Sequence, residues 1–118
     1  MTPTEIATAF TDLCKKGEFE AAGKQFWSDN VVSCEAMDGP MARVQGRAAV
    51  EAKGAWWYAN HEIHSVKVEG PYVNGNQFIL RFSMDVTPKG GQRLQMDEMG
   101  VYTLENGKIA EERFFYGG

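Results

Sequence analysis

The sequence predicts an α+β fold in which three helices come first and long antiparallel strands follow. Up to about residue 60, apolar residues recur with the spacing of amphipathic helices, and after that point they alternate as they do in strands. Three glycine-containing pairs then separate the later segments as hairpin turns do: Asn74-Gly75, Gly90-Gly91 and Asn106-Gly107. A curved sheet wrapped around helices can leave a cavity at its open end, and such cavities bind small molecules.

The first helix has recognisable start and stop signals. Thr2 can cap it, Pro3 suits its first turn, and Glu5 completes a capping box. Gly17 suits the position just past its end. A helix is therefore expected between these signals.

Two more helices are expected before the strands begin. The second starts at Phe19, ends near residues 28–30, and carries Phe19, Ala22, Gly23 and Phe26 on one side. The third covers residues 47–60 after Gly46, and one of its stripes contains Val50, Gly54, Trp57 and His61.

The strands are shorter before the third helix and longer after it. Short strands are expected at 31–36 and 41–45, and longer ones at 62–70, 77–86, 94–102 and 108–116. In the segment 62–70, we expect His64, Val66 and Val68 to share one face. No linker or internal repeat interrupts this order, so we expect a single domain over residues 1–118.

Charge and hydropathy exclude several classes of protein. The net charge is −4, from 12 basic and 16 acidic residues, and the longest basic run is Lys15-Lys16. Binding to nucleic acid through its phosphates is therefore not expected. No apolar run approaches the roughly 20 residues needed to span a bilayer, and the first residues lack the pattern of a signal peptide. No membrane contact is expected.

The cysteines and histidines do not predict a metal site. Cys14 and Cys34 lie 20 positions apart without a C-x-x-C spacing. We interpret them as reduced, partly buried thiols of a cytoplasmic protein. His61 and His64 are three positions apart but are expected at a helix end and in a strand, so a shared metal is not expected. No metal or organic cofactor is predicted.

A glutamate interrupts the apolar face of the strand at 94–102. Its even positions are Leu94, Met96, Glu98, Gly100 and Tyr102. Because side chains alternate across a strand, Glu98 is expected to point at whatever the strand covers. Glycine at position 100 leaves open space beside it. Both a functional role and a structural, hydrogen-bonded role are compatible with this pattern.

The last strand can present either of two side chains to the same face. A strict two-residue turn at Asn106-Gly107 would place Arg113 opposite Gly100, on the face of Glu98. A turn with a bulge would place Glu112 there instead. An arginine on this face would pair with Glu98, and no catalyst would be implied.

Four strings in the chain resemble a known superfamily. They are "FWSDNVV", "GRAAV", "VEGP" and "GVYTLENGKIAEERFFY". In this order they resemble the nuclear transport factor 2-like superfamily, and within it the SnoaL-like and ketosteroid-isomerase-like members. The resemblance covers nearly the whole chain. It implies a cystatin-like fold, with a cone-shaped curved sheet wrapped around three helices and an interior pocket. The same fold hosts isomerases, dehydratases, cyclases, epoxide hydrolases and non-catalytic modules.

The catalytic residues of ketosteroid isomerases are only partly matched. The position of the proton-shuttling carboxylate falls on Glu35 if "SDNVV" is the anchor and on Cys34 if Gly17 is the anchor; we prefer Glu35. The position of the oxyanion-holding tyrosine falls on Phe10, and that of the protonated carboxyl on Gly100. Steroid isomerisation by that mechanism is therefore not expected. The resemblance favours Glu112 rather than Arg113 on the pocket face.

These observations lead to two alternative functions. The first is a cofactor-independent acid–base enzyme of isomerase, dehydratase or cyclase type, acting on a small apolar carbonyl compound with Glu35, Glu98 and Glu112 as catalytic residues. The second is a non-catalytic module that binds a small ligand or dimerises. Epoxide hydrolysis is a minor third option, which would need Arg113 beside Glu98. The expected substrate-binding residues are Phe10, Trp57, Phe82, Met84, Phe114 and Tyr116.

A homodimer is also expected. Members of the superfamily commonly dimerise through the outer face of the sheet. Three residues expected on that face are apolar where solvent would otherwise be expected: Ile79, Met99 and Val101.

Overall fold

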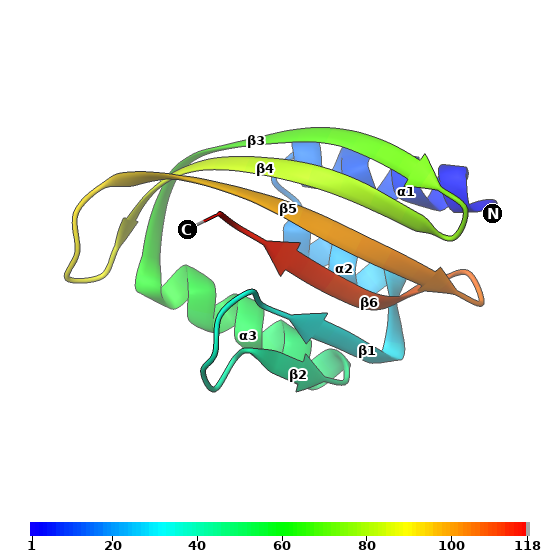
Figure 1. Ribbon diagram of the computed structural model, residues 1–118, viewed down its shortest axis with the longest axis horizontal. Helices are drawn as coiled ribbons and strands as arrows, with labels where there is room; N and C mark the ends of the chain where they lie inside the picture. Colours follow the sequence, from blue (N-terminus) through cyan, green and yellow to red (C-terminus); the bar gives the residue numbers. More distant parts are fainter. Residues whose placement is uncertain (118) are drawn as a thin grey trace.

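Three helices and six strands follow one another in the predicted order in a computed structural model that describes residues 1–117 (Figure 1). The helices are α1 (Pro3–Lys15), α2 (Phe19–Phe26) and α3 (Arg47–Asn60). The strands are β1 (Trp27–Cys34), β2 (Arg43–Gln45), β3 (His61–Asn74), β4 (Gln77–Pro88), β5 (Leu94–Glu105) and β6 (Lys108–Phe115). The α+β prediction is confirmed.

The strands form one mixed sheet that curls around the helices. Its order is β2-β1-β6-β5-β4-β3, and β1 runs parallel to β6 while the other neighbours are antiparallel. Helices α1 and α2 lie behind the long strands, whereas α3 lies beside β1 and β2 (Figure 1). The enclosed space holds the apolar core, in which Phe78, Leu80, Val86 and Ile109 are at most 1% exposed. Burial of these side chains supplies most of the driving force for folding.

The first helix begins where its capping signals predict. The Glu5 backbone N–H donates to the Thr2 hydroxyl at 3.1 Å, and the Thr2 backbone N–H donates to the Glu5 carboxylate at 2.9 Å. Pro3 occupies the first turn, where its missing N–H is of no consequence. The reciprocal capping box therefore sets the N-terminal boundary of α1.

Strand β1 begins four residues earlier than the sequence predicts. It starts at Trp27, directly after α2, and this residue already pairs with Ile109 of β6. The indole ring packs against Gly23 of α2, where an added Cβ would lie 2.5 Å from the ring. The glycine thus allows the tight approach that joins helix and strand without a loop.

A bulge in β3 overturns the predicted alternation around His64. The pairing register with β4 shifts at this residue, so His64 is the extra residue of the bulge. His64 is exposed and its ring nitrogen lies 2.8 Å from the Thr87 hydroxyl, whereas Val66 remains on the inner side. The strand also continues past the break expected at Gly70, again through a register shift.

A bulge in β6 decides which side chain enters the pocket. Asn106 and Gly107 have φ values of 52° and 78°, so they form the tight turn that the sequence predicts. Beyond the turn, Ala110 is an extra residue in β6, and the register then places Glu112 opposite Tyr102. Arg113 therefore points to the outer face, as the family resemblance favoured.

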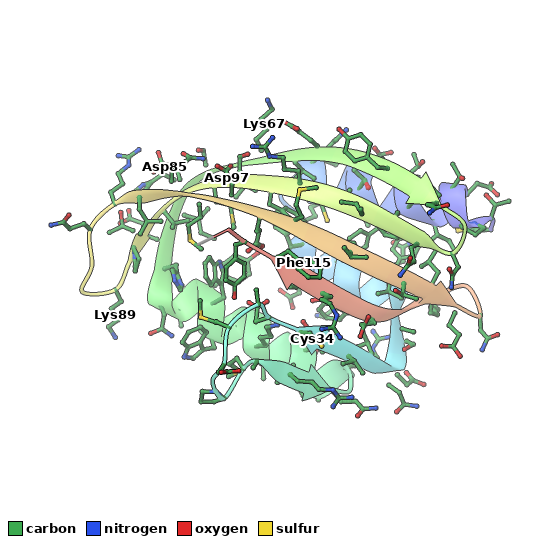
Figure 2. The ribbon with its side chains drawn as sticks, in the orientation of Figure 1. Cys34, Lys67, Asp85, Lys89, Asp97 and Phe115 are labelled. Atoms are coloured by element: carbon green, nitrogen blue, oxygen red, sulfur yellow. The ribbon has the colours of Figure 1, made fainter. Side chains whose placement is uncertain are left out.

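The outer face of the sheet carries charged side chains. Lys67, Asp85 and Asp97 lie on this face, away from the helices (Figure 2). Arg93 donates to both carboxylate oxygens of Asp85, at 2.9 and 2.7 Å. No helix formed by residues 1–117 has the length and apolar character needed to cross a membrane.

Candidate functional site

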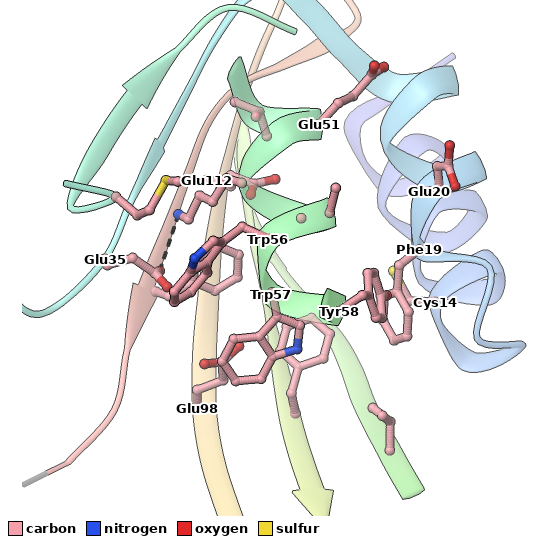
Figure 3. A pocket seen from close by; sticks show the side chains of 18 of the residues that line it. Cys14, Phe19, Glu20, Glu35, Glu51, Trp56, Trp57, Tyr58, Glu98 and Glu112 are labelled. Atoms are coloured by element: carbon pink, nitrogen blue, oxygen red, sulfur yellow. Dashed lines mark ion pairs between the residues drawn. The ribbon is translucent and has the colours of Figure 1, made fainter. Parts of the chain in front are cut away.

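A cavity of about 330 Å³ lies between the inner face of the sheet and the three helices (Figure 3). Most of its wall is apolar, and its volume lies in the lower part of the range typical of ligand-binding sites. The exposed side chains of Trp56 and Tyr58 on α3 also border it. Five glutamates and one lysine are among its lining residues. Glu20 and Glu51 are exposed, whereas Glu35, Glu98, Glu112 and Lys53 are partly or fully buried in the apolar wall.

Glu98 points into the cavity, as the alternation in its strand predicts. It is partly buried, it pairs across the sheet with Phe82, and among residues 1–117 no cation forms an ion pair with it. Burial raises the pKa of Glu98 to about 7, and the charge of Glu35 adds to the effect. The carboxyl is therefore poised to gain or lose a proton near neutral pH.

Glu112 is held by two hydrogen bonds inside the cavity wall and is 7% exposed. The Trp27 indole N–H donates to one carboxylate oxygen at 2.8 Å, and the Ser33 hydroxyl donates to the other at 2.9 Å. Burial raises the pKa of Glu112, and these two donors oppose that increase. The bonds fix the orientation of its carboxylate.

Glu35 follows the end of β1 and lines the cavity. Its backbone N–H donates to the Ala42 carbonyl at 2.8 Å, which extends the pairing between β1 and β2. Its Oε2 lies 3.4 Å from the Lys53 ammonium of α3, the ion pair drawn in Figure 3. Burial raises the pKa of Glu35, and the charge of Lys53 opposes this. Cys34, the alternative base position, is buried and is not among the cavity-lining residues.

Five of the six predicted substrate-binding residues line the cavity. They are Phe10, Trp57, Phe82, Met84 and Phe114. The sixth, Tyr116, is not among the lining residues, because β6 ends at Phe115 and Tyr116 lies beyond the strand. The substrate-binding role of Tyr116 therefore stays a prediction.

The sequence interpretation missed Lys53, Trp27 and Ser33. Lys53 lies three residues after Val50 and four before Trp57, and both of these line the cavity. This helical spacing could have indicated that Lys53 faces the cavity as well. Ser33 is two residues before Glu35, and the alternation of β1, continued one residue past its end, places both side chains on the same side. For Trp27, no signal in the sequence indicates that its indole N–H meets Glu112.

Cys14 also borders the cavity, but it is not reactive. Both cysteines are free and buried, and burial raises the pKa of Cys14 to about 12. Its thiol is therefore protonated at neutral pH and is a poor nucleophile. Among residues 1–117, no three His, Cys, Asp or Glu side chains lie close enough together to hold a metal ion.

The arrangement supplies the groups needed for proton transfer in an apolar enclosure. A carboxyl group with a pKa of about 7, such as Glu98, exchanges a proton near neutral pH, and apolar walls exclude competing water. Epoxide hydrolysis would need an arginine beside the carboxylates, but Arg113 lies on the outer face, where it donates to Glu111 at 3.0 Å.

Solved structures similar to this chain share its fold. A candidate SnoaL-like polyketide cyclase from Mesorhizobium loti, known from a crystal structure, shares 55% of its sequence with this chain. The two structures have a TM-score of 0.96, and the match covers 98% of this chain and 100% of that chain. A cystatin-like protein from Xanthomonas campestris is 17% identical, with a TM-score of 0.79 over 100% of this chain and 92% of that chain. A candidate polyketide cyclase from Pseudomonas putida is 18% identical, with a TM-score of 0.71 over 99% of this chain and 92% of that chain.

These comparisons identify the family. None of the curated proteins compared with the chain matches it. The two more distant structures show a common fold alone, and they agree with the predicted cystatin-like architecture. The sequence model of the SnoaL-like domain family matches residues 1–116, and the chain belongs to this family.

Proposed function

We propose that the protein is a cofactor-independent acid–base enzyme that moves a proton beside the carbonyl of a small apolar compound. The observation that carries this proposal is Glu98, a carboxyl in an apolar cavity whose pKa is raised to about 7. A general acid or base is most efficient when its pKa lies close to the working pH. Glu98 exchanges the proton at the carbon beside the carbonyl.

The other two carboxylates support this role. Burial is the main cause of the raised pKa of Glu98; the charges of Glu35 and Glu112 add to it, and the charge of Lys53 opposes it. Glu35 Oε2 has no hydrogen-bond donor and lies 3.4 Å from the Lys53 ammonium, so this ion pair keeps a second carboxylate in the cavity wall. Isomerisation, dehydration and ring closure all begin with such a proton transfer. The 55% identical candidate polyketide cyclase favours ring closure among them.

The assembly and setting of the enzyme are part of the proposal. A single domain over residues 1–118 acts as a homodimer in the cytoplasm without a metal or organic cofactor. Met99 and Phe115 are cross-strand neighbours on the outer face and are 37% and 49% exposed. With Ile79 and Val101 they form an apolar patch that a second copy would cover. Analytical ultracentrifugation of the wild type and of Phe115→Glu tests the dimer.

The catalytic role can be tested without knowledge of the natural substrate. A panel of small cyclic ketones such as 2-tetralone is incubated with the protein in heavy water, and exchange of the protons beside the carbonyl is followed by NMR. We expect the wild type to accelerate exchange and Glu98→Gln to lose about 100-fold or more of that acceleration. Asp97→Asn is the matched control, because this neighbouring carboxylate is exposed on the outer face. Exchange that is equally fast in Glu98→Gln would contradict the proposal.

A non-catalytic ligand-binding module of the same fold is the second candidate. It is favoured by the partners of two of the carboxylates, because Glu112 accepts two hydrogen bonds and Glu35 pairs with Lys53. This alternative predicts that the ketones bind but that no variant or wild-type protein accelerates their exchange.

A further inference from the structure

Proton removal beside a carbonyl leaves negative charge on the carbonyl oxygen, and a cavity lined by five glutamates must offset it. Lys53 is the only lysine or arginine among the described residues that line the cavity. We propose that the Lys53 ammonium binds and stabilises this oxyanion, which makes Lys53 a catalytic residue beside Glu98. This inference rests on the proposed proton transfer and adds a statement about the class of substrate. The substrate presents its carbonyl oxygen, rather than a cationic group, to α3.

The contacts of Lys53 leave it able to bind a further oxygen. Its ammonium donates to the Ser33 hydroxyl at 2.8 Å and lies 3.4 Å from Glu35 Oε2. That oxygen of Glu35 has no hydrogen-bond donor, so the ion pair does not use a well-aligned N–H. An ammonium carries three N–H groups, and across residues 1–117 only the one directed at Ser33 makes a hydrogen bond. The remaining N–H groups are available to a ligand.

A chain of hydrogen bonds fixes the position of this ammonium. Lys53 donates to Ser33, Ser33 donates to Glu112, and Glu112 also accepts from the Trp27 indole. The Lys53 side chain is 12% exposed, and its ammonium lies 5.4 Å from the centre of the Phe114 ring. A charged donor held in place before the reaction stabilises developing charge more effectively than one that must reorganise.

The hydrogen bonds of Ser33 exclude a nucleophilic role for it. A serine beside a lysine can act as a nucleophile, but Ser33 is 0% exposed and does not line the cavity. Its hydroxyl already accepts from Lys53 and donates to Glu112. Ser33 is therefore a positioning residue for Lys53 rather than a group that contacts substrate.

Tyr102 is the alternative donor, and its surroundings make it the weaker one. Its ring stacks on Phe78 with centroids 4.9 Å apart, and its hydroxyl would lie 3.1 Å from a Cβ at Gly100. Burial, followed by the charge of Glu112, holds the pKa of the Tyr102 hydroxyl well above its usual value. A less acidic hydroxyl donates a weaker hydrogen bond, whereas the ammonium brings a full positive charge.

The reaction step balances without any further reagent. Glu98 takes the proton from the carbon beside the carbonyl, and the electron pair of that C–H bond forms a carbon–carbon double bond. The electrons of the C=O double bond move to oxygen, and Lys53 donates a hydrogen bond to the resulting enolate oxygen. Return of the proton from Glu98 to a different carbon completes isomerisation. In ring closure the enolate carbon attacks a second carbonyl of the substrate, and the alkoxide formed there takes the proton from Glu98.

The test uses 4-nitrophenol, whose anion resembles an enolate and has its own visible absorption band. The nitrophenol is bound to the intact wild-type protein and to Lys53→Met, and its ionisation in the bound state is followed by absorbance as pH rises. We expect the ionisation constant of the bound phenol to fall about tenfold or more in Lys53→Met, because an opposite charge at contact distance favours the anion. Lys67→Met is the matched control, since the Lys67 side chain is 74% exposed on the outer face.

Further variants keep the test decisive. If Lys53→Met does not fold, Lys53→Gln retains a donor for Ser33 while removing the charge, and the same fall in ionisation constant is expected. An unchanged ionisation constant in the folded Lys53 variant, a fall in Tyr102→Phe instead, or failure of the wild type to bind nitrophenol would overturn the assignment.

The two proposals can fail separately. Ketone exchange that depends on Glu98, together with phenol ionisation that does not depend on Lys53, would retain the proposed function and reject the role of Lys53. Phenol ionisation that depends on Lys53 in a protein that exchanges no ketone proton would retain the anion site and reject catalysis.

Discussion

The carboxylates on the two faces of the sheet are the same chemical group in opposite environments. Inside, burial raises the pKa values of Glu98 and Glu112. Outside, two hydrogen bonds from the Arg93 guanidinium lower the pKa of Asp85. Position on the strand therefore decides whether a carboxyl group is a charged surface residue or a proton carrier.

The two environments meet at neighbouring residues. Asp97 and Glu98 are adjacent on β5, and Glu111 and Glu112 are adjacent on β6, yet only the second of each pair lines the cavity. Strand alternation separates each pair, and on β6 the bulge at Ala110 sets which member points inward. Matched substitutions within each pair can therefore isolate the effect of the environment.

The largest contrast in stability is expected between Glu112→Ala and Glu111→Ala. Removing the Glu112 carboxylate leaves the Trp27 indole and the Ser33 hydroxyl without their acceptor inside the protein. We expect a loss of about 3 kcal/mol in the free energy of unfolding. Glu111→Ala removes only an exposed ion pair with Arg113 and is expected to cost less than about 0.5 kcal/mol. Urea denaturation measures both, and equal losses would show that the inner carboxylate is not held as described.

The pH dependence of stability is expected to be the next largest effect. Because the pKa of Glu98 is about 7 in the folded protein, above the ordinary glutamate value of 4.5, the folded state binds more protons between these pH values. The stability that this group contributes is fully present below about pH 4.5 and is lost as pH rises through about 7. We expect Glu98→Gln to remove a decrease on the order of 2 kcal/mol across this window.

Thermal or urea unfolding of both proteins at several pH values measures this difference. Glu35 and Glu112 also have raised pKa values, but they are present in both proteins and largely cancel in the comparison. Asp97→Asn serves as the control and should keep the wild-type pH dependence. If the free energy of unfolding of Glu98→Gln changed with pH as steeply as that of the wild type, the raised pKa of Glu98 would be wrong.

The smallest effect is expected from the outer ion pairs. Arg93→Ala removes the partner of Asp85, but both groups are in contact with water, which screens their interaction. We expect no resolvable change in the unfolding midpoint at physiological salt. A clear loss of stability in differential scanning calorimetry would show that the outer carboxylates are more strongly coupled than their exposure implies.

Local chemistry allowed much of the fold to be predicted from the sequence. The Thr2 capping signal, the Asn106-Gly107 turn and the alternation around Glu98 each act over a few residues, and each is confirmed. The family strings then supplied the arrangement of the helices and the curved sheet.

The remaining features depend on contacts between distant segments. The bulges at His64 and Ala110 arise from pairing with neighbouring strands, which no short stretch encodes. Trp27 and Glu112 are 85 residues apart in the chain, and only the parallel pairing of β1 with β6 brings them together. Lys53 was overlooked because a lysine on a helix usually faces solvent.

A direct titration of Glu98 measures whether its carboxyl group exchanges a proton near neutral pH. Carbon-13 labelling of glutamate allows the side-chain carboxyl of Glu98 to be followed by NMR across the pH range, with Glu98→Gln used to assign its signal. We expect a midpoint of about 7 for Glu98. A midpoint at the ordinary value for glutamate, about 4.3, would place this carboxyl in a water-like environment and contradict the account.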